Sequence, residues 1–140
     1  MTRPAPRNLG LDLVRVTETT AIAASRWMGL GQRAKADLEA SEAMLHTLNE
    51  LDVDGHIVIG EETKLDIDTP LDSGQHVGTG HGLELDVVVD PIEGLNLLAQ
   101  GLPGSIAVAG MAPRGSMHPL APASYMEKIV VDRDAAEALV

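Results

Sequence analysis

The chain has 140 residues, of which 44% are hydrophobic, and this is enough apolar material for one core of moderate size. The formal net charge of -11, without a lysine or arginine cluster, argues against nucleic acid and anionic membranes as partners. Without cysteine the chain forms neither a disulfide framework nor a thiolate metal site. No apolar run typical of a secretory signal follows the first residues, so we expect a cytoplasmic protein. No linker divides the sequence, so we expect one domain over residues 1–140.

Two amphipathic helices are predicted first. Apolar and small residues recur at helical spacing over residues 9–28, until Gly29 and Gly31 end the pattern. A second stripe of the same period covers residues 36–51. Asp37 stands at the start of this second helix, where a carboxylate commonly stabilises the N-terminus by capping or through the helix dipole. Taken alone, the residues around Asp37 favour this structural role.

Short strands and turns are predicted next. Residues 56–59 form an apolar strand that ends at Gly60 and is followed at once by Glu61. The polar stretch 63–75 predicts an exposed loop or weak hairpin. The glycine-rich run 77–82 precedes a strand and does not join a strand to a helix, so it predicts a sharp chain reversal and not a phosphate-binding loop.

The centre of the sequence is a run of three valines, 87–89, followed by Asp90, Pro91 and Glu93. The β-branched residues favour a strand covered on both faces. Because Pro91 has no backbone N–H, we expect the strand ladder to end at Asp90. Two carboxylates at the exit of a buried strand form a compact set of hard oxygen ligands, which suits Mg²⁺ or Mn²⁺. The alternative is that Asp90 and Glu93 are turn formers on a solvated loop.

The remaining pattern predicts a short helix over 95–100, a strand over 105–111, a turn at 113–115, a strand over 125–131 and a helix that begins at Asp134. The five histidines lack the spacing of a zinc site, and the serines lack the context of a nucleophile. We therefore assign neither group a catalytic role.

The segment 90–94, with the sequence DPIEG, resembles the D-P-[IL]-[DE]-G-[TS] signature of the lithium-sensitive, metal-dependent sugar and inositol phosphatases. Six further blocks look like those of the class II fructose-1,6-bisphosphatase family, in that order and at nearly that spacing. The likeness extends from about Leu11 to Val131. The six blocks are residues 15–18, 27–31, 36–37, 54–61, 77–80 and 125–128.

The resemblance implies an α/β fold, the layered α-β-α fold of sugar phosphatases with a mixed sheet. It also implies that residues 1–140 are the N-terminal, metal-binding part of such a domain, because the family is more than twice as long as this chain. The family converts fructose 1,6-bisphosphate to fructose 6-phosphate with Mn²⁺ or Mg²⁺ in gluconeogenesis. Its second half supplies a further metal ligand and the loops that grip the sugar phosphate.

The resemblance also implies a set of metal ligands. Asp37 and Glu61 match the ligands of one metal ion, while Asp90 and Glu93 match the ligands of another. For Asp37 this implied role replaces the capping role that the residues alone favour.

The resemblance implies substrate contacts at Glu93, Gly94, Leu95 and Tyr125, and it exposes one departure. Leu95 stands where the family signature has a threonine, whose hydroxyl would position or activate the attacking water. Leucine has no hydroxyl, and losing a proton-transfer group of this kind costs roughly 10²-fold in rate. We therefore expect impaired catalysis at the position of Leu95.

Three hypotheses remain open. The first is a metal-dependent phosphatase for fructose 1,6-bisphosphate, or for another sugar bisphosphate such as sedoheptulose 1,7-bisphosphate. The second is a truncated homologue with lost turnover that acts as a cation-binding or assembly partner, and the third is a general acidic cation-binding domain. Half of a layered fold leaves a sheet edge and an apolar face uncovered, so we also expect homo-oligomers.

Overall fold

The computed structural model describes residues 8–61, 69–119 and 129–138. These residues form three α-helices, four strands and one short 3-10 helix. None of the helices within these ranges is long and apolar enough to span a membrane. The elements in chain order are α1 (Leu9–Ser25), α2 (Arg33–Asn49), β1 (Val53–Ile59), β2 (His76–Val77), β3 (Leu83–Glu93), α3 (Leu95–Gln100), β4 (Ile106–Pro113) and η1 (Ala136–Ala138).

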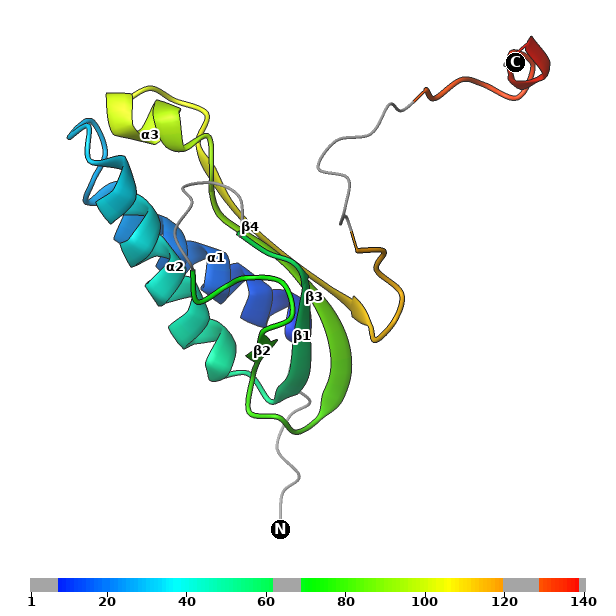
Figure 1. The fold of residues 1–140 in the computed structure, drawn as a ribbon, viewed down its shortest axis with the longest axis horizontal. Helices are drawn as coiled ribbons and strands as arrows, with labels where there is room; N and C mark the ends of the chain where they lie inside the picture. The colour runs from blue at the N-terminus through cyan, green and yellow to red at the C-terminus, as the bar shows by residue number, and fades with distance from the viewer. Residues whose placement is uncertain (1–7, 62–68, 120–128, 139–140) are drawn as a thin grey trace.

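The four strands form one mixed sheet in the order β2-β1-β3-β4. β1 and β3 are parallel, whereas β2 and β4 are antiparallel to their neighbours. Helices α1 and α2 lie side by side against one face of this sheet (Figure 1). The predicted α/β class with a mixed sheet is therefore confirmed, and the described residues comprise one helical layer and one sheet layer of it.

The main apolar core lies between the two long helices and the sheet. Val16 of α1 and Met44 and Leu48 of α2 meet Val87 and Val89 of β3, and all five side chains are at most 2% exposed. A second apolar cluster lies where α2 meets the end of β3 and the short helix α3. Its buried members are Ala24, Ala36, Ala40, Ile92, Leu95 and Leu98.

The two long helices confirm the periodic pattern in the sequence, with shifts at the end of α1 and at both ends of α2. Asn8 caps α1, because its side-chain oxygen accepts hydrogen bonds from the backbone N–H groups of Gly10 and Leu11 at 3.0 and 3.3 Å. α1 ends at Ser25, before the predicted position 28, and α2 begins at Arg33, before the predicted position 36. Apolar periodicity marks the buried turns of a helix and leaves its exposed ends undefined.

The strand predicted at 87–89 exists, but two expectations about it are wrong. β3 does not end at Asp90 and continues through Pro91 to Glu93. Its pairing with β4 shifts register between Asp90 and Glu93, and a proline fits at such an irregularity because no ladder hydrogen bond needs its missing N–H. Within the described residues the strand is also not covered on both faces, since the helices cover one face and Val88, on the other, is only half-buried.

The remaining predictions have mixed outcomes. The helix over 95–100 is α3, and the strand over 105–111 is β4 with small shifts at its ends. Of the strand predicted over 125–131, residues 125–128 lie outside the described ranges and residues 129–131 form no strand. The helix predicted from Asp134 is reduced to η1 within the described part of the chain.

Candidate functional site

Two of the predicted metal ligands lie at the ends of neighbouring parallel strands, Asp90 within β3 and Glu61 just after β1. In the pairing of β1 with β3, Ile59 lies beside Val88. Glu61 and Asp90 come two residues later on their respective segments. The carboxyl ends of neighbouring parallel strands lie at the same end of a sheet, so Glu61 and Asp90 lie at the same end of this sheet. We call it the carboxylate end of the sheet.

Asp90 and Glu93 close β3 at this end. Val89 is 2% exposed and belongs to the core cluster under the helices. Successive side chains of a strand point to opposite faces, so Asp90 points to the face away from the helices. Asp90 is half-buried there, and Glu93 is exposed.

Asp37 reaches the carboxylate end from the helical layer. Its neighbours on α2, Ala36 and Ala40, pack in the second apolar cluster with Ile92 and Leu95. This part of α2 therefore lies against the end of β3, and it carries Asp37 with it. The residue at the N-cap of α2 is Gln32, and the first turn contains no acidic residue, so Asp37 does not cap the helix.

Two of the four carboxylates are deeply buried, because Asp37 is 4% and Glu61 is 2% exposed. A buried carboxylate is stable only beside compensating charge or hydrogen-bond donors. The donor set of four carboxylates fits a hard divalent cation such as Mg²⁺ or Mn²⁺. Within residues 8–61, 69–119 and 129–138, however, no three or more His, Asp or Glu side chains are grouped closely enough to hold a metal ion. The fold thus places four oxygen-donor residues at one end of the sheet without showing a complete cage.

Gly94 and Leu95 form the turn from β3 into α3. Gly94 is the N-cap of α3 with φ 85°, a left-handed conformation that glycine adopts without strain. A Cβ atom at this position would also lie 3.4 Å from the Cα atom of Ser105. Leu95 follows as the first helical residue, 8% exposed, with its side chain in the apolar cluster that contains Ile92. The residue at the threonine position of the signature is thus part of the packing of this corner.

Tyr125 lies outside the described residues, so its predicted substrate contact stays a prediction. The substrate contacts predicted at Glu93, Gly94 and Leu95 also stay predictions. What the structure adds is that these three residues are consecutive at the end of β3 and the start of α3.

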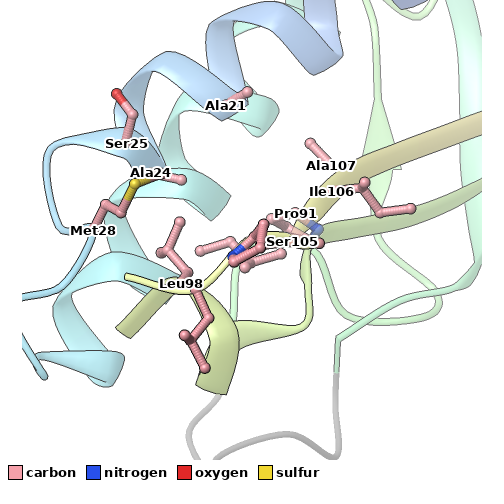
Figure 2. A pocket seen from close by; sticks show the side chains of 13 residues that line it. Ala21, Ala24, Ser25, Met28, Pro91, Leu98, Ser105, Ile106 and Ala107 are labelled. Carbon is pink, nitrogen blue, oxygen red and sulfur yellow. The ribbon is translucent and has the colours of Figure 1, made fainter. Parts of the chain in front are cut away.

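A small apolar pocket lies beside this corner, between the end of α1 and the start of β4 (Figure 2). Its volume is about 180 Å³, and its walls include Ala21 of α1, Met28 of the turn after α1, Leu98 of α3 and Ile106 of β4. Among the described residues that line it, the polar side chains are serines and none is charged. A doubly phosphorylated sugar would find no charged partner here, so this pocket is not our candidate substrate site.

A polar cluster that the sequence did not predict lies toward the other end of β3. The Arg114 Nη2 group donates a hydrogen bond to the backbone oxygen of Asp54 at 2.7 Å and lies 3.4 Å from its carboxylate. The Arg114 Nε atom lies 3.7 Å from the carboxylate of Asp86, which also accepts a hydrogen bond from the backbone N–H of Met117 at 2.9 Å. We call Asp54, Asp86 and Arg114 the arginine cluster.

The arginine cluster explains how Asp86 is accommodated at 2% exposure. The backbone N–H of Met117, then that of Gly115, holds the pKa of Asp86 below its ordinary value of 3.8, and the charge of Arg114 acts in the same direction. Burial alone would raise this pKa, but the donors prevail. Asp86 is therefore an ionised structural carboxylate.

The sequence analysis placed Arg114 only in a turn. No local motif links it to Asp54 or Asp86, which lie far away in the chain. The signal would have been the antiparallel pairing of β3 with β4, in which Leu85 faces Pro113 and so brings Arg114 to the start of β3. Such a register is not evident before the two strands are aligned.

Comparisons with known proteins give one family. The family described as bacterial fructose-1,6-bisphosphatase, glpX-encoded, matches residues 7–140. The chain is similar to fructose-1,6-bisphosphatase 1 class 2 of Escherichia coli strain K12, with 42% identity over 125 residues, and equally to fructose-1,6-bisphosphatase class 2 of Shigella flexneri. Each alignment covers 89% of this chain but 37% of the relative, so the chain spans little more than a third of the length of these relatives.

Proposed function

The chain belongs to the family of bacterial fructose-1,6-bisphosphatases, and on that premise we propose that it hydrolyses the 1-phosphate ester of fructose 1,6-bisphosphate to give fructose 6-phosphate and phosphate, a reaction of gluconeogenesis. The observation that carries the proposal is that the family match extends over residues 7–140 and so includes all four carboxylates of the carboxylate end. Since the chain spans 37% of the relatives, catalysis by this length of chain is itself part of the proposal.

We assign Asp37, Glu61, Asp90 and Glu93 as the ligands of divalent cations, Mn²⁺ or Mg²⁺. When bound, such a cation polarises a phosphoryl oxygen and lowers the pKa of a water molecule. The carboxylates hold this positive charge at the end of the sheet, where their own negative charge would otherwise repel the phosphate of the substrate. This matters in a chain with a formal net charge of -11.

The turn from β3 into α3 supplies the substrate contacts of the proposal. Glu93 and Gly94 contact the sugar phosphate, and Gly94 allows close approach because it has no side chain. Tyr125 contributes a further contact. Leu95 can neither donate nor accept a proton, so water activation at this position depends on the cations alone.

A second candidate function follows from the packing of Leu95. Leu95 is 8% exposed in an apolar cluster and stands where the family signature has a threonine. A homologue of this kind retains cations without turnover and acts as a binding or assembly partner. We keep it as the alternative to catalysis.

One assay separates the two candidates. Inorganic phosphate release from fructose 1,6-bisphosphate is measured with Mn²⁺, with a chelator control and with Leu95→Thr in parallel. Metal-dependent release by the wild-type chain supports the phosphatase, and a parallel assay with sedoheptulose 1,7-bisphosphate ranks the substrates. Release only after Leu95→Thr places the defect at the attacking water. If neither folded protein releases phosphate, catalysis is contradicted and the role as a binding partner is favoured.

We propose that the protein is cytoplasmic and that its ligand is a small sugar bisphosphate. We also propose that neither nucleic acid nor a membrane is its partner. The charge balance of the sequence supports this, because anionic partners are repelled. We also propose that residues 1–140 act as one domain and that the chain forms homo-oligomers. Light scattering of the purified chain tests the last point, and a monomer contradicts it.

A further inference from the structure

The two edges of the sheet are very different. β2 forms one edge with two residues, whereas β4 forms the other edge with the eight residues Ile106–Pro113. Among the strands that the structure describes, none pairs with the outer side of β4. Proteins protect long edges with charges, bulges or covering segments, yet β4 contains no charged residue. Its outer edge is therefore an open template for one more strand.

The side chains of β4 add an apolar surface to this edge. Ala109 and Met111 of β4 pack against the core under the helices, so Ile106 and Val108, which are 57% and 37% exposed, lie on the other face of the sheet. The backbone edge and these two side chains together make the outer side of β4 suitable for a short, apolar, β-branched segment.

The chain contains such a segment, and the structure shows it uncovered. Ile129, Val130 and Val131 are 72%, 81% and 41% exposed and form no strand. The sequence pattern predicts a strand there, because β-branched residues favour pleated, half-buried positions. In Figure 1 this C-terminal segment, in orange and red, lies apart from the sheet.

We propose that Ile129, Val130 and Val131 dock on the outer edge of β4 as a fifth strand of the sheet within the same chain. Docking then buries apolar surface of both the segment and β4, and the backbone N–H and C=O groups of the two strands form hydrogen bonds with each other. Residues 114–128 connect them. Fifteen residues reach about 50 Å when extended, while an eight-residue strand measures about 26 Å, so docking is feasible in either strand direction.

A disulfide experiment tests the docking, and the absence of cysteine from the chain makes it unambiguous. Val108→Cys is combined with Ile129→Cys in one protein and with Val130→Cys in another, and the rates of intramolecular crosslinking are compared. Successive side chains of a strand point to opposite faces, so one pair should crosslink at least about ten-fold faster than the other. The control combines Val130→Cys with Leu38→Cys, an exposed position on α2.

Equal rates for the two pairs, rates no higher than that of the control, or crosslinks only between chains would overturn the proposal. A second measurement avoids cysteines and uses amide hydrogen exchange of β4. Val130→Asp should accelerate exchange of the outward-facing β4 amides at least about ten-fold, whereas Ala135→Asp, a substitution further along the same exposed segment, should not. Unchanged exchange in Val130→Asp overturns the docking. Both readouts report strand pairing, so they are independent of any phosphatase activity.

Discussion

The carboxylates at the two ends of β3 have different surroundings. Toward its start, Asp86 is held by the backbone N–H of Met117 and by Arg114, whose guanidinium also contacts Asp54. Toward its end lie Asp37 and Glu61, which are 4% and 2% exposed, and Asp90 and Glu93, which belong to the strand itself. The first arrangement is complete within the chain, and the second is the one to which we assign cations.

This difference shows how the burial of a carboxylate side chain should be interpreted. Asp86 is as buried as Glu61, at 2% exposure each, so burial alone does not separate a structural carboxylate from a candidate ligand. For Asp86 the structure identifies Arg114 and the backbone N–H of Met117, both in the turn after β4, as its partners, whereas Glu61 is assigned as a ligand on the family resemblance. The contrast is tested by substituting each end and measuring cation affinity and stability separately.

The largest effect is expected at the carboxylate end. Asp90→Asn removes one charged ligand and should weaken Mn²⁺ binding by about 100-fold, because a neutral amide is a much poorer ligand than a carboxylate. Isothermal titration with Mn²⁺ measures the change. The matched control is Glu84→Gln, an exposed position on the same strand, which should leave the affinity within about two-fold. Equal affinities of wild type and Asp90→Asn would remove Asp90 from the site.

The next effect concerns the apolar packing beside the carboxylate end. Leu95→Thr places a hydroxyl in the cluster that contains Ala36 and Ile92, and it should lower the free energy of unfolding by about 2 kcal/mol. Urea denaturation measures it through the midpoint. Leu97→Thr on the same helix is the control, since Leu97 is 36% exposed. That substitution should cost about 0.5 kcal/mol. Similar costs for both would show that the corner is loosely packed.

The third prediction concerns the arginine cluster. Asp86→Asn keeps the shape of the side chain but removes the charge that faces Arg114, and it should lower Tm by roughly 3 °C at neutral pH. Its Mn²⁺ affinity should stay within about two-fold of wild type, because Asp86 is structural. Thermal unfolding and titration on the same sample measure both. A large loss of affinity would erase the distinction between the two ends of β3.

Much of this fold could be predicted because its signals are local. Helical periodicity located α1 and α2, and the valine run located the centre of β3. The end of β3 could not be predicted, because Pro91 stops a regular ladder but not one with a register shift opposite β4. Of the strand predicted over 125–131, the described residues 129–131 form none in the structure, because propensity alone does not pair a segment with the edge of a sheet.

Some features of the candidate site could likewise be predicted from the sequence, and others could not. Asp90 and Glu93 stand in one continuous motif, so the sequence brings them together without knowledge of the fold. The burial of Asp37 depends on how α2 packs against Ile92 and Leu95, which no local pattern specifies. Arg114 was missed for the same reason, because its partners are brought to it by strand register.

The smallest effect is the pH dependence of the arginine cluster. The pKa of Asp86 is held below its ordinary value of 3.8, so the folded state binds fewer protons at this carboxyl than the unfolded state does. The stabilisation from Asp86 is therefore complete above that value and is lost as the pH falls through the folded pKa. The difference in Tm between wild type and Asp86→Asn should be constant from about pH 7 to pH 5 and should shrink below about pH 4. Thermal unfolding across this range measures it, and Glu84→Gln should show no such trend. A difference that stays constant to the lowest pH would mean that hydrogen-bond geometry, and not the charge on Asp86, stabilises this end of β3.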